Sequence, residues 1–256
     1  MAKERGMNFR TIMEESRARY KGFHEAIKAE RKPRSFAEAI EAKRAAGLNP
    51  IVAEIKPSSP TGGRLAEVKD PGSLAGALVA GGACGLSVLT EERYFGGSLE
   101  NLREVARVAS VPVLRKDFLF AKEQVGESYH YGADSVLLIS SFFDVPTLER
   151  FLGEARRLRM EPLVEVHSLE DVRRSREAGA EIYVINNRDK DTMEVDLGRT
   201  RALAGHVEGV KISASGIETQ DDLRYALRYC DAALVGSAIM RARDPGARVR
   251  EFVHGG

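Results

Sequence analysis

Eight short apolar runs alternate along the chain with segments whose apolar residues recur at helical spacing. The runs cover residues 50–54, 85–89, 112–115, 134–139, 162–166, 181–185, 210–213 and 232–235. Most are apolar at successive rather than alternate positions, which is typical of parallel strands that are covered on both faces. This order predicts a repeated strand–helix unit.

A weak internal repeat supports the same arrangement. A glycine or another small residue comes just before an apolar run in GGACGLSVL (81–89), GADSVLLI (132–139), GAEIYVI (179–185) and CDAALVG (230–236). Glycine is common where a helix ends. Eight such units in about 205 residues match a (β/α)8 TIM barrel. The alternative, a doubly wound sheet, usually has five or six strands and a GxGxxG turn after the first, and no such turn follows 50–54.

The first strand is preceded by a segment with a helical pattern. Apolar residues at helical spacing begin at Phe9 and continue through Ala26, and a second helix is predicted over 35–46. We therefore expect residues 1–256 to form a single (β/α)8 barrel domain, in which residues 1–45 are a helical N-terminal extension packed on the barrel.

The composition excludes several classes of protein. The 39 Lys and Arg residues balance 38 Asp and Glu residues, so the basic excess of a nucleic-acid or acidic-membrane binder is missing. Two cysteines without CxxC spacing, and a start without the apolar core of a signal peptide, favour a cytoplasmic protein. The five histidines lack metal-ligand spacing, so we expect no metal. We expect the protein to be a monomer or a weak homodimer.

Charged and amide side chains gather at the carboxyl ends of four predicted strands. Side-chain alternation places Glu54 and Lys56 on one face of the first strand. The other strand ends carry Lys116, Glu165, Asn186 and Arg188. Active sites of such barrels lie at the carboxyl ends of the strands, and buried charges require partners or a ligand. The pattern therefore predicts an active site at this mouth of the barrel.

Two neighbours of these residues are expected to have lesser roles. Asp117 has the opposite parity to Lys116, so we expect it to orient a neighbouring group. His167 follows the fifth strand, and we expect it to be a loop histidine without a role.

Two Ser-Gly or Gly-Ser pairs follow the last two strands. Ser215 and Gly216 come after the seventh strand, and Gly236 and Ser237 come after the eighth. Glycine lets the backbone approach an anion, and the loops after strands seven and eight are the usual phosphate site of this fold. These pairs predict a phosphorylated small-molecule ligand.

Eight segments, in order, resemble the indole-3-glycerol phosphate synthases. They are AEIKPSSPTGG (53–63), LSVLTEERYFGGS (86–98), LRKDF (114–118), GADSVLLI (132–139), MEPLVEVH (160–167), INNRD (185–189), SASGI (213–217) and LVGSAIM (234–240). The resemblance implies a cofactor-free carboxy-lyase of tryptophan biosynthesis. Its substrate would be 1-(2-carboxyphenylamino)-1-deoxyribulose 5-phosphate, which is closed to indole-3-glycerol phosphate with loss of CO₂ and water.

The resemblance also implies roles for individual residues. Lys116 corresponds to the general acid and Glu165 to the general base, while Lys56 and Glu54 assist binding and dehydration. The remaining catalytic and substrate-binding positions are Asn186, Ser59, Pro60, Phe95, Phe118, Leu137, Ile139, Arg188 and Ala214. The phosphate would be held by Ser215, Gly216, Gly236 and Ser237, with help from Lys56.

Three positions depart from the family pattern: Thr61 stands where the family usually has Ser, Val184 where it usually has Gly, and Ala214 where it has Glu. The family has glutamate before the Ser-Gly of the seventh strand, where this chain has Ala214. One carboxylate fewer then faces the same cations, so an impaired or altered-site synthase, which binds substrate but turns over poorly, is one alternative. Another is a Schiff-base aldolase that uses Lys56 or Lys116 on a sugar phosphate.

Overall fold

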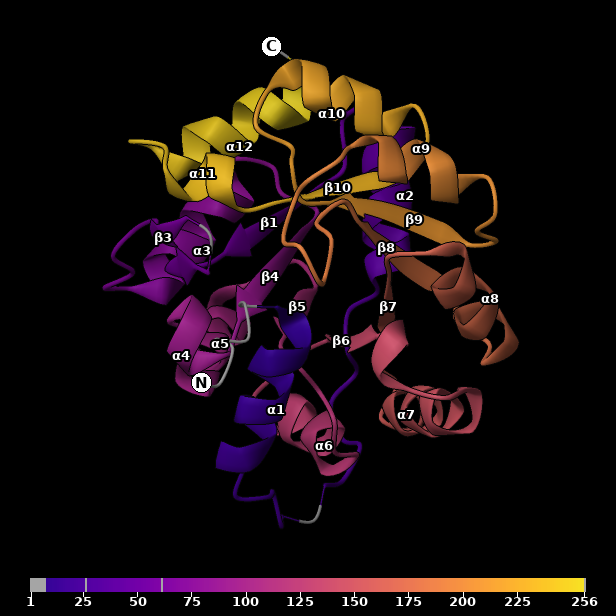
Figure 1. Cartoon of the computed structure of the whole chain (residues 1–256). Helices are drawn as coiled ribbons and strands as arrows, with labels where there is room; N and C mark the ends of the chain where they lie inside the picture. Colours follow the sequence, from indigo (N-terminus) through magenta and orange to yellow (C-terminus); the bar gives the residue numbers. More distant parts are fainter. Residues whose placement is uncertain (1–7, 26, 61, 256) are drawn as a thin grey trace, which may run out of the picture.

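Eight parallel strands close into a barrel with helices around the outside (Figure 1). The computed structural model describes residues 8–25, 27–60 and 62–255. Around the barrel the strands follow the order β1-β10-β9-β8-β7-β6-β5-β4, so the first strand pairs with the last. Their bounds are β1 Ile51–Ile55, β4 Gly85–Leu89, β5 Val113–Lys116, β6 Ser135–Ile139, β7 Leu163–Val166, β8 Ile182–Asn186, β9 Val210–Ala214 and β10 Ala232–Val235. The predicted (β/α)8 barrel is confirmed.

Several strands end later than the sequence pattern predicts, because polar end residues still pair in the sheet. Lys116 pairs with Leu89 of β4 and is therefore the last residue of β5. Asn186 pairs with Ala214, and these two residues end β8 and β9. A short hairpin that was not predicted, β2 (Ser58–Ser59) with β3 (Gly63–Arg64), lies in the segment after β1.

Capping side chains set where many helices begin. Asp70, Asp144 and Asp244 each accept a backbone N–H three residues further on and precede a first turn that contains proline. The helices are α1 Phe9–Arg19, α2 Phe36–Ala45, α3 Pro71–Ala80, α4 Glu92–Phe95, α5 Leu99–Val108, α6 Glu123–His130, η1 Ser140–Phe142, α7 Val145–Arg157, α8 Leu169–Glu177, α9 Gly198–Ala204, α10 Gln220–Leu227, α11 Ser237–Met240 and α12 Pro245–His254. No helix of the described ranges is long and apolar enough to cross a membrane.

The apolar side chains form two cores, one on each face of the barrel wall. Ala53 and Ile55 point outward and pack under the surrounding helices. Val52, Leu114 and Leu163 point inward and fill the barrel. The same side-chain alternation continues to the strand ends, where Glu54, Lys116 and Glu165 point inward at the mouth of the barrel.

The two helices before β1 pack at opposite ends of the barrel. Phe9 and Ile12 of α1 belong to the inner core, and the Phe9 ring contacts Phe118 at the carboxyl end of β5. Phe36 of α2 lies against Gly85 at the start of β4, which is the opposite end. The helical pattern expected to run through Ala26 ends at Arg19, because Tyr20 adopts an extended backbone. Residues 1–7 and 26 of the expected extension, and Thr61 in the segment after β1, lie outside the described residues.

Candidate active site

A cavity of about 340 Å³ lies at the carboxyl ends of the strands. Every strand of the barrel contributes to its wall, and α1 contributes Phe9. All the positions predicted for the site line this cavity: Glu54, Lys56, Ser59, Pro60, Phe95, Lys116, Phe118, Leu137, Ile139, Glu165, Asn186, Arg188, Ala214, Ser215, Gly216, Gly236 and Ser237. The sequence did not point to Phe9, nor to Met193 and Val195 in the loop after β8.

Glu54 holds the two lysines of the cavity. One carboxylate oxygen, Oε2, lies 2.8 Å from Lys56 Nζ, and the other, Oε1, lies 3.5 Å from Lys116 Nζ. Burial alone raises the pKa of the Glu54 carboxyl, but the two ammonium groups outweigh burial and bring it below its ordinary value. Both Glu54 oxygens are therefore engaged with cations.

Glu165 is the contrasting carboxylate. It is 1% exposed, and within the described part of the chain neither of its oxygens has an aligned hydrogen-bond partner. Burial raises its pKa, whereas the neighbouring His167, the charge of Lys116 and the Asn186 amide lower it, and the net shift is downward. Glu165 is thus an ionised carboxylate with free acceptor positions beside a lysine.

The loop after β9 has a constrained backbone. Ser215 has φ of 69° and Gly216 has φ of 81°, and the left-handed region is costly for serine. Asn187 supports this conformation, because its amide donates to the Ser215 carbonyl at 3.0 Å and to the Ser213 hydroxyl at 3.1 Å. The Asn187 side-chain oxygen accepts in turn from the Thr200 hydroxyl at 2.8 Å.

Gly236 brings the loop after β10 close to the lysine pair. A Cβ on this residue would lie 2.3 Å from Glu54 Oε2. The missing side chain therefore allows the backbone that follows β10 to lie directly against the buried carboxylate.

The family model and the sequence relatives agree on one family. A family model described as indole-3-glycerol phosphate synthase matches residues 7–252. The chain belongs to the indole-3-glycerol phosphate synthase family. Relatives with this name include one from Methanocaldococcus jannaschii, 43% identical over 80% of this chain and 78% of the relative, and one from Pyrococcus furiosus, 39% identical over 82% and 94%. Indole-3-glycerol phosphate synthase 1 of Streptomyces coelicolor is 42% identical over 80% and 78%.

Two solved structures share the fold of this indole-3-glycerol phosphate synthase family member. A 3-hexulose-6-phosphate synthase matches with a TM-score of 0.62 at 19% identity, over 79% of this chain and 97% of that one. A thiamine phosphate pyrophosphorylase from Pyrococcus furiosus matches with a TM-score of 0.58 at 19% identity, over 80% and 93%. At this identity, the likeness concerns the barrel architecture alone.

Position 214 places a small, buried side chain in the wall of the cavity. Ala214 is the last residue of β9, pairs with Asn186 and lines the cavity. Arg188 lines the same cavity and donates to the Met193 carbonyl at 2.7 Å, and burial lowers the pKa of its guanidinium. The cavity of this family member therefore has a cation at Arg188 and no carboxylate at position 214.

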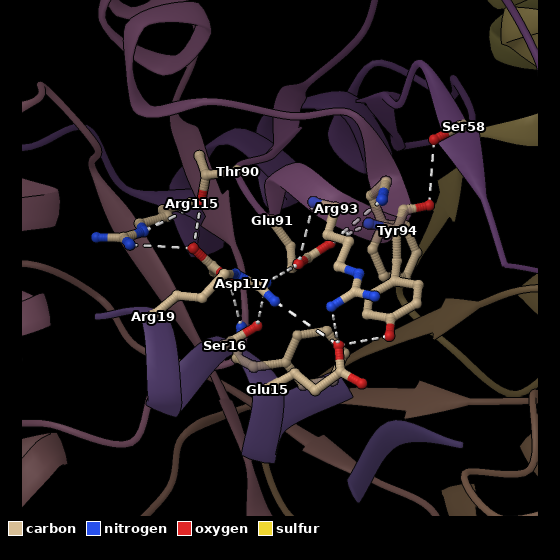
Figure 2. A network of polar contacts seen from close by, with 12 residues as sticks. Glu15, Ser16, Arg19, Ser58, Thr90, Glu91, Arg93, Tyr94, Arg115 and Asp117 are labelled. Carbon is tan, nitrogen blue, oxygen red and sulfur yellow. Dashed lines mark hydrogen bonds and ion pairs between the residues drawn. The ribbon is translucent and has the colours of Figure 1, made fainter. Parts of the chain in front are cut away.

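A buried ion-pair network includes Arg115 and Asp117, the two neighbours of Lys116 in the sequence (Figure 2). Arg115 points to the outer face of β5, where it bonds the Asp117 carboxylate at 3.0 Å and the Glu127 carboxylate at 2.7 Å. The Thr90 hydroxyl donates to Asp117 at 2.5 Å, and Asp117 also accepts the Phe118 N–H at 2.8 Å. Asp117 thus orients its neighbours, as its parity predicted.

The same view shows how α1 is joined to α4 at the mouth (Figure 2). Arg19 forms an ion pair of 2.8 Å with Glu91, whose carboxylate also caps the first turn of α4. Glu15 accepts from Arg93 at 2.8 Å and from the Tyr94 hydroxyl at 2.7 Å. Because α4 ends at the cavity-lining Phe95, these contacts join α1 to the wall of the site.

In residues 8–25, 27–60 and 62–255, His, Cys, Asp and Glu side chains form no group of three or more that could hold a metal ion. The polar groups of the cavity are instead lysines, carboxylates, an amide and a guanidinium, which suit acid–base chemistry on an anionic substrate.

Proposed function

We propose that Lys116 is the general acid and Glu165 the general base with which this chain forms indole-3-glycerol phosphate. The indole-3-glycerol phosphate synthase reaction, a carboxy-lyase step of tryptophan biosynthesis, follows from the family match over residues 7–252. The assignment of individual residues to steps is our inference from the geometry of the cavity.

The observation that carries the assignment is the difference between the two buried carboxylates. Glu54 is engaged by Lys56 at 2.8 Å and by Lys116 at 3.5 Å, so taking up a proton would disrupt two ion pairs. Glu165 has no aligned partner among the described residues, and its pKa is held below the ordinary value. A base must be both ionised and free to accept, and Glu165 meets both conditions.

The proposed steps balance protons. Lys116 donates to the ketose carbonyl oxygen while the aromatic carbon that bears the carboxylate attacks the carbonyl carbon, and CO₂ then leaves with its bonding electrons remaining in the ring. Lys56 donates to the new hydroxyl group, which departs as water. Glu165 removes the proton from the adjacent carbon as the indole double bond forms. The reaction consumes one proton overall, and Glu54 holds both lysines near the reacting atoms throughout.

The charges of the cavity suit the substrate. A phosphate near −2 and a carboxylate of −1 would face Lys56, Lys116 and Arg188. We place the phosphate at the loops after β9 and β10, where Ser215 and Gly236 lie, and the aromatic end near Asn186 and Arg188. The other proposed contacts are Ser59, Pro60, Phe95, Phe118, Leu137, Ile139, Gly216 and Ser237.

The proposed function is tested by supplying 1-(2-carboxyphenylamino)-1-deoxyribulose 5-phosphate and following indole fluorescence, since the chain has no Trp. We expect Lys116→Ala to lower kcat by about 10²-fold or more, the low end of general acid–base effects. The matched control is Lys122→Ala, because Lys122 is an exposed lysine on the surface and should leave kcat unchanged. A Lys116→Ala enzyme within about threefold of wild type would contradict the acid role.

A Schiff-base mechanism makes a different prediction for the same lysines. Such a nucleophile must be a neutral amine, whereas Lys56 and Lys116 both lie against the Glu54 carboxylate. Borohydride treatment in the presence of a ketose phosphate should therefore leave both lysines unmodified, and a covalent adduct on either would favour the aldolase alternative.

For this activity we place the chain in the cytoplasm as a monomer or weak homodimer. Support comes from two buried free cysteines, Cys84 and Cys230, and from exposed large apolar side chains that are few and scattered in the described structure: Val108, Leu169 and Val195. Light scattering at increasing protein concentration tests the oligomeric state, and a stable assembly larger than a dimer would contradict it.

A further inference from the structure

We propose that His167 is a positioning residue for Glu165, which keeps this carboxylate ionised and turned toward the cavity. The proposal rests on Glu165 acting as the base. It assigns a role to a histidine that the sequence pattern left as a loop residue without one.

The two side chains lie side by side at the end of β7. His167 Nε2 is 3.3 Å from Glu165 Oε1, and both side chains are almost fully buried. Neither nitrogen of the ring has an aligned hydrogen-bond partner among the described residues, and the same holds for both Glu165 oxygens. A small rotation of the ring would turn this contact into a hydrogen bond and satisfy an atom on each side.

Burial makes such a contact necessary for the base. A carboxylate that is almost fully buried without a donor is costly, and it reduces that cost by taking up a proton. Lys116 lies in the same cavity but is already 3.5 Å from Glu54. His167 Nε2, 3.3 Å from Glu165 Oε1, is a donor beside this carboxylate whose ring is not committed to another carboxylate among the described residues. The Asn186 amide is a second neighbour that favours the ionised form of Glu165.

The position of the imidazole ring is fixed by its surroundings. The His167 backbone N–H donates to Asp171 Oδ2 at 3.0 Å, and Asp171 is paired with Arg174 at 3.0 Å. The ring packs edge-to-face on Phe9 of α1, with centroids 5.9 Å apart. The charged and titratable groups identified around the pair are Glu165 on β7, Asp171 and Arg174 on α8, and Lys116 on β5, while α1 presents the apolar Phe9 ring.

His167 acts through Glu165 and does not itself line the cavity, whereas Glu165 does. Substrate binding should therefore be insensitive to His167, while proton removal should depend on it.

The kinetic test compares His167→Leu, His167→Gln and the exposed-histidine control His206→Gln. We expect His167→Leu to lower kcat by about tenfold or more with KM within about twofold, since a proton-transfer group is affected and the binding contacts are not. The acidic limb of kcat/KM should move to higher pH, because the Glu165 carboxylate loses a neighbour that favours ionisation. Gln, whose amide can donate near the Nε2 position, should recover part of kcat.

A purely structural role gives a different result. The proposal would be overturned if His167→Leu left kcat unchanged or left the acidic limb of kcat/KM at the same pH. It would also be overturned if His167→Gln lost as much kcat as His167→Leu. Thermal unfolding of the three variants checks that the barrel is intact.

A second measurement does not depend on turnover. The ¹³C carboxyl resonance of Glu165, assigned by its disappearance in Glu165→Gln, is titrated in wild type and in His167→Leu. We expect the Glu165 pKa to be higher in His167→Leu, and equal values would overturn the proposal even if the protein folds normally. If wild type makes no indole-3-glycerol phosphate, the proposed function fails, while this titration still decides whether His167 controls Glu165.

Discussion

Glu54 and Lys56, two residues apart at the end of β1, form an ion pair of 2.8 Å inside the mouth of the barrel. The second oxygen of the same carboxylate lies 3.5 Å from Lys116, which comes from a different strand. One buried charge therefore fixes the spacing of both lysines, and a change at Glu54 affects two proposed proton donors at once.

Glu54→Gln should lower kcat by about 10²-fold or more, because neither lysine keeps its charged partner. KM should stay unchanged or fall, since the cavity becomes more positive toward an anionic substrate. Steady-state kinetics with the matched control Glu67→Gln, an exposed carboxylate beside surface cations, measures the effect. A raised KM with unchanged kcat would mean that Glu54 only binds substrate.

The low pKa of Glu54 also predicts how stability depends on pH. A carboxyl whose pKa is lower in the folded than in the unfolded chain stabilises the fold above the unfolded value, and this contribution disappears as pH falls through the folded value. The difference in unfolding free energy between wild type and Glu54→Gln should therefore be constant from about pH 7 to pH 5 and shrink below the ordinary value of 4.5. Urea unfolding across this pH range measures the difference in unfolding free energy. A difference that grows on acidification would contradict the prediction.

Ala214→Glu should raise kcat for indole formation by about tenfold or more. The new carboxylate would enter the cavity wall that carries Arg188, a guanidinium whose pKa burial lowers. Ala214→Gln, with similar size and no charge, is the control and should give no increase. If Ala214→Glu is no faster than wild type, the rest of the site already compensates for the alanine.

Gly236→Ala should lower kcat by about 10²-fold, a typical cost of displacing a reacting group by about 1 Å. The added methyl group would lie 2.3 Å from Glu54 Oε2 and would push this carboxylate away from Lys56. Gly76→Ala is the matched control, because a Cβ there meets no atom within 4 Å. A fully active Gly236→Ala enzyme would show that Glu54 can move without loss.

Arg115→Met should lower the free energy of unfolding by about 3–5 kcal/mol, since Asp117 and Glu127 would remain buried without their shared cation. Urea denaturation of this variant and of Arg107→Met, an exposed arginine on α5, tests the expectation. The control should change stability by less than about 0.5 kcal/mol. A similar small change in Arg115→Met would show that the network contributes little.

The strands were predictable because short apolar runs that alternate with helical segments are typical of buried parallel strands. Side-chain alternation along the strands then predicted that Glu54, Lys116 and Glu165 share one cavity, and this prediction needed no information about long-range contacts. The helical pattern expected through Ala26 was wrong beyond Arg19, because apolar spacing does not specify that the backbone becomes extended at Tyr20.

The supporting contacts of the site were not predictable in the same way. Asn187 has the opposite parity to Asn186, so the strand pattern gives no reason to connect it with Ser215. His167 follows Glu165 by two residues, yet burial of both side chains at 3.3 Å depends on Phe9 and α8 packing over them. Such contacts join segments that are far apart in the chain, and a local pattern contains no information about them.

The pairing of β1 with β10 has a consequence for protein synthesis. Glu54 is made early, but the backbone of Gly236 that lies against it is made near the end of the chain. The barrel therefore cannot close around a substrate until the final strand has emerged from the ribosome.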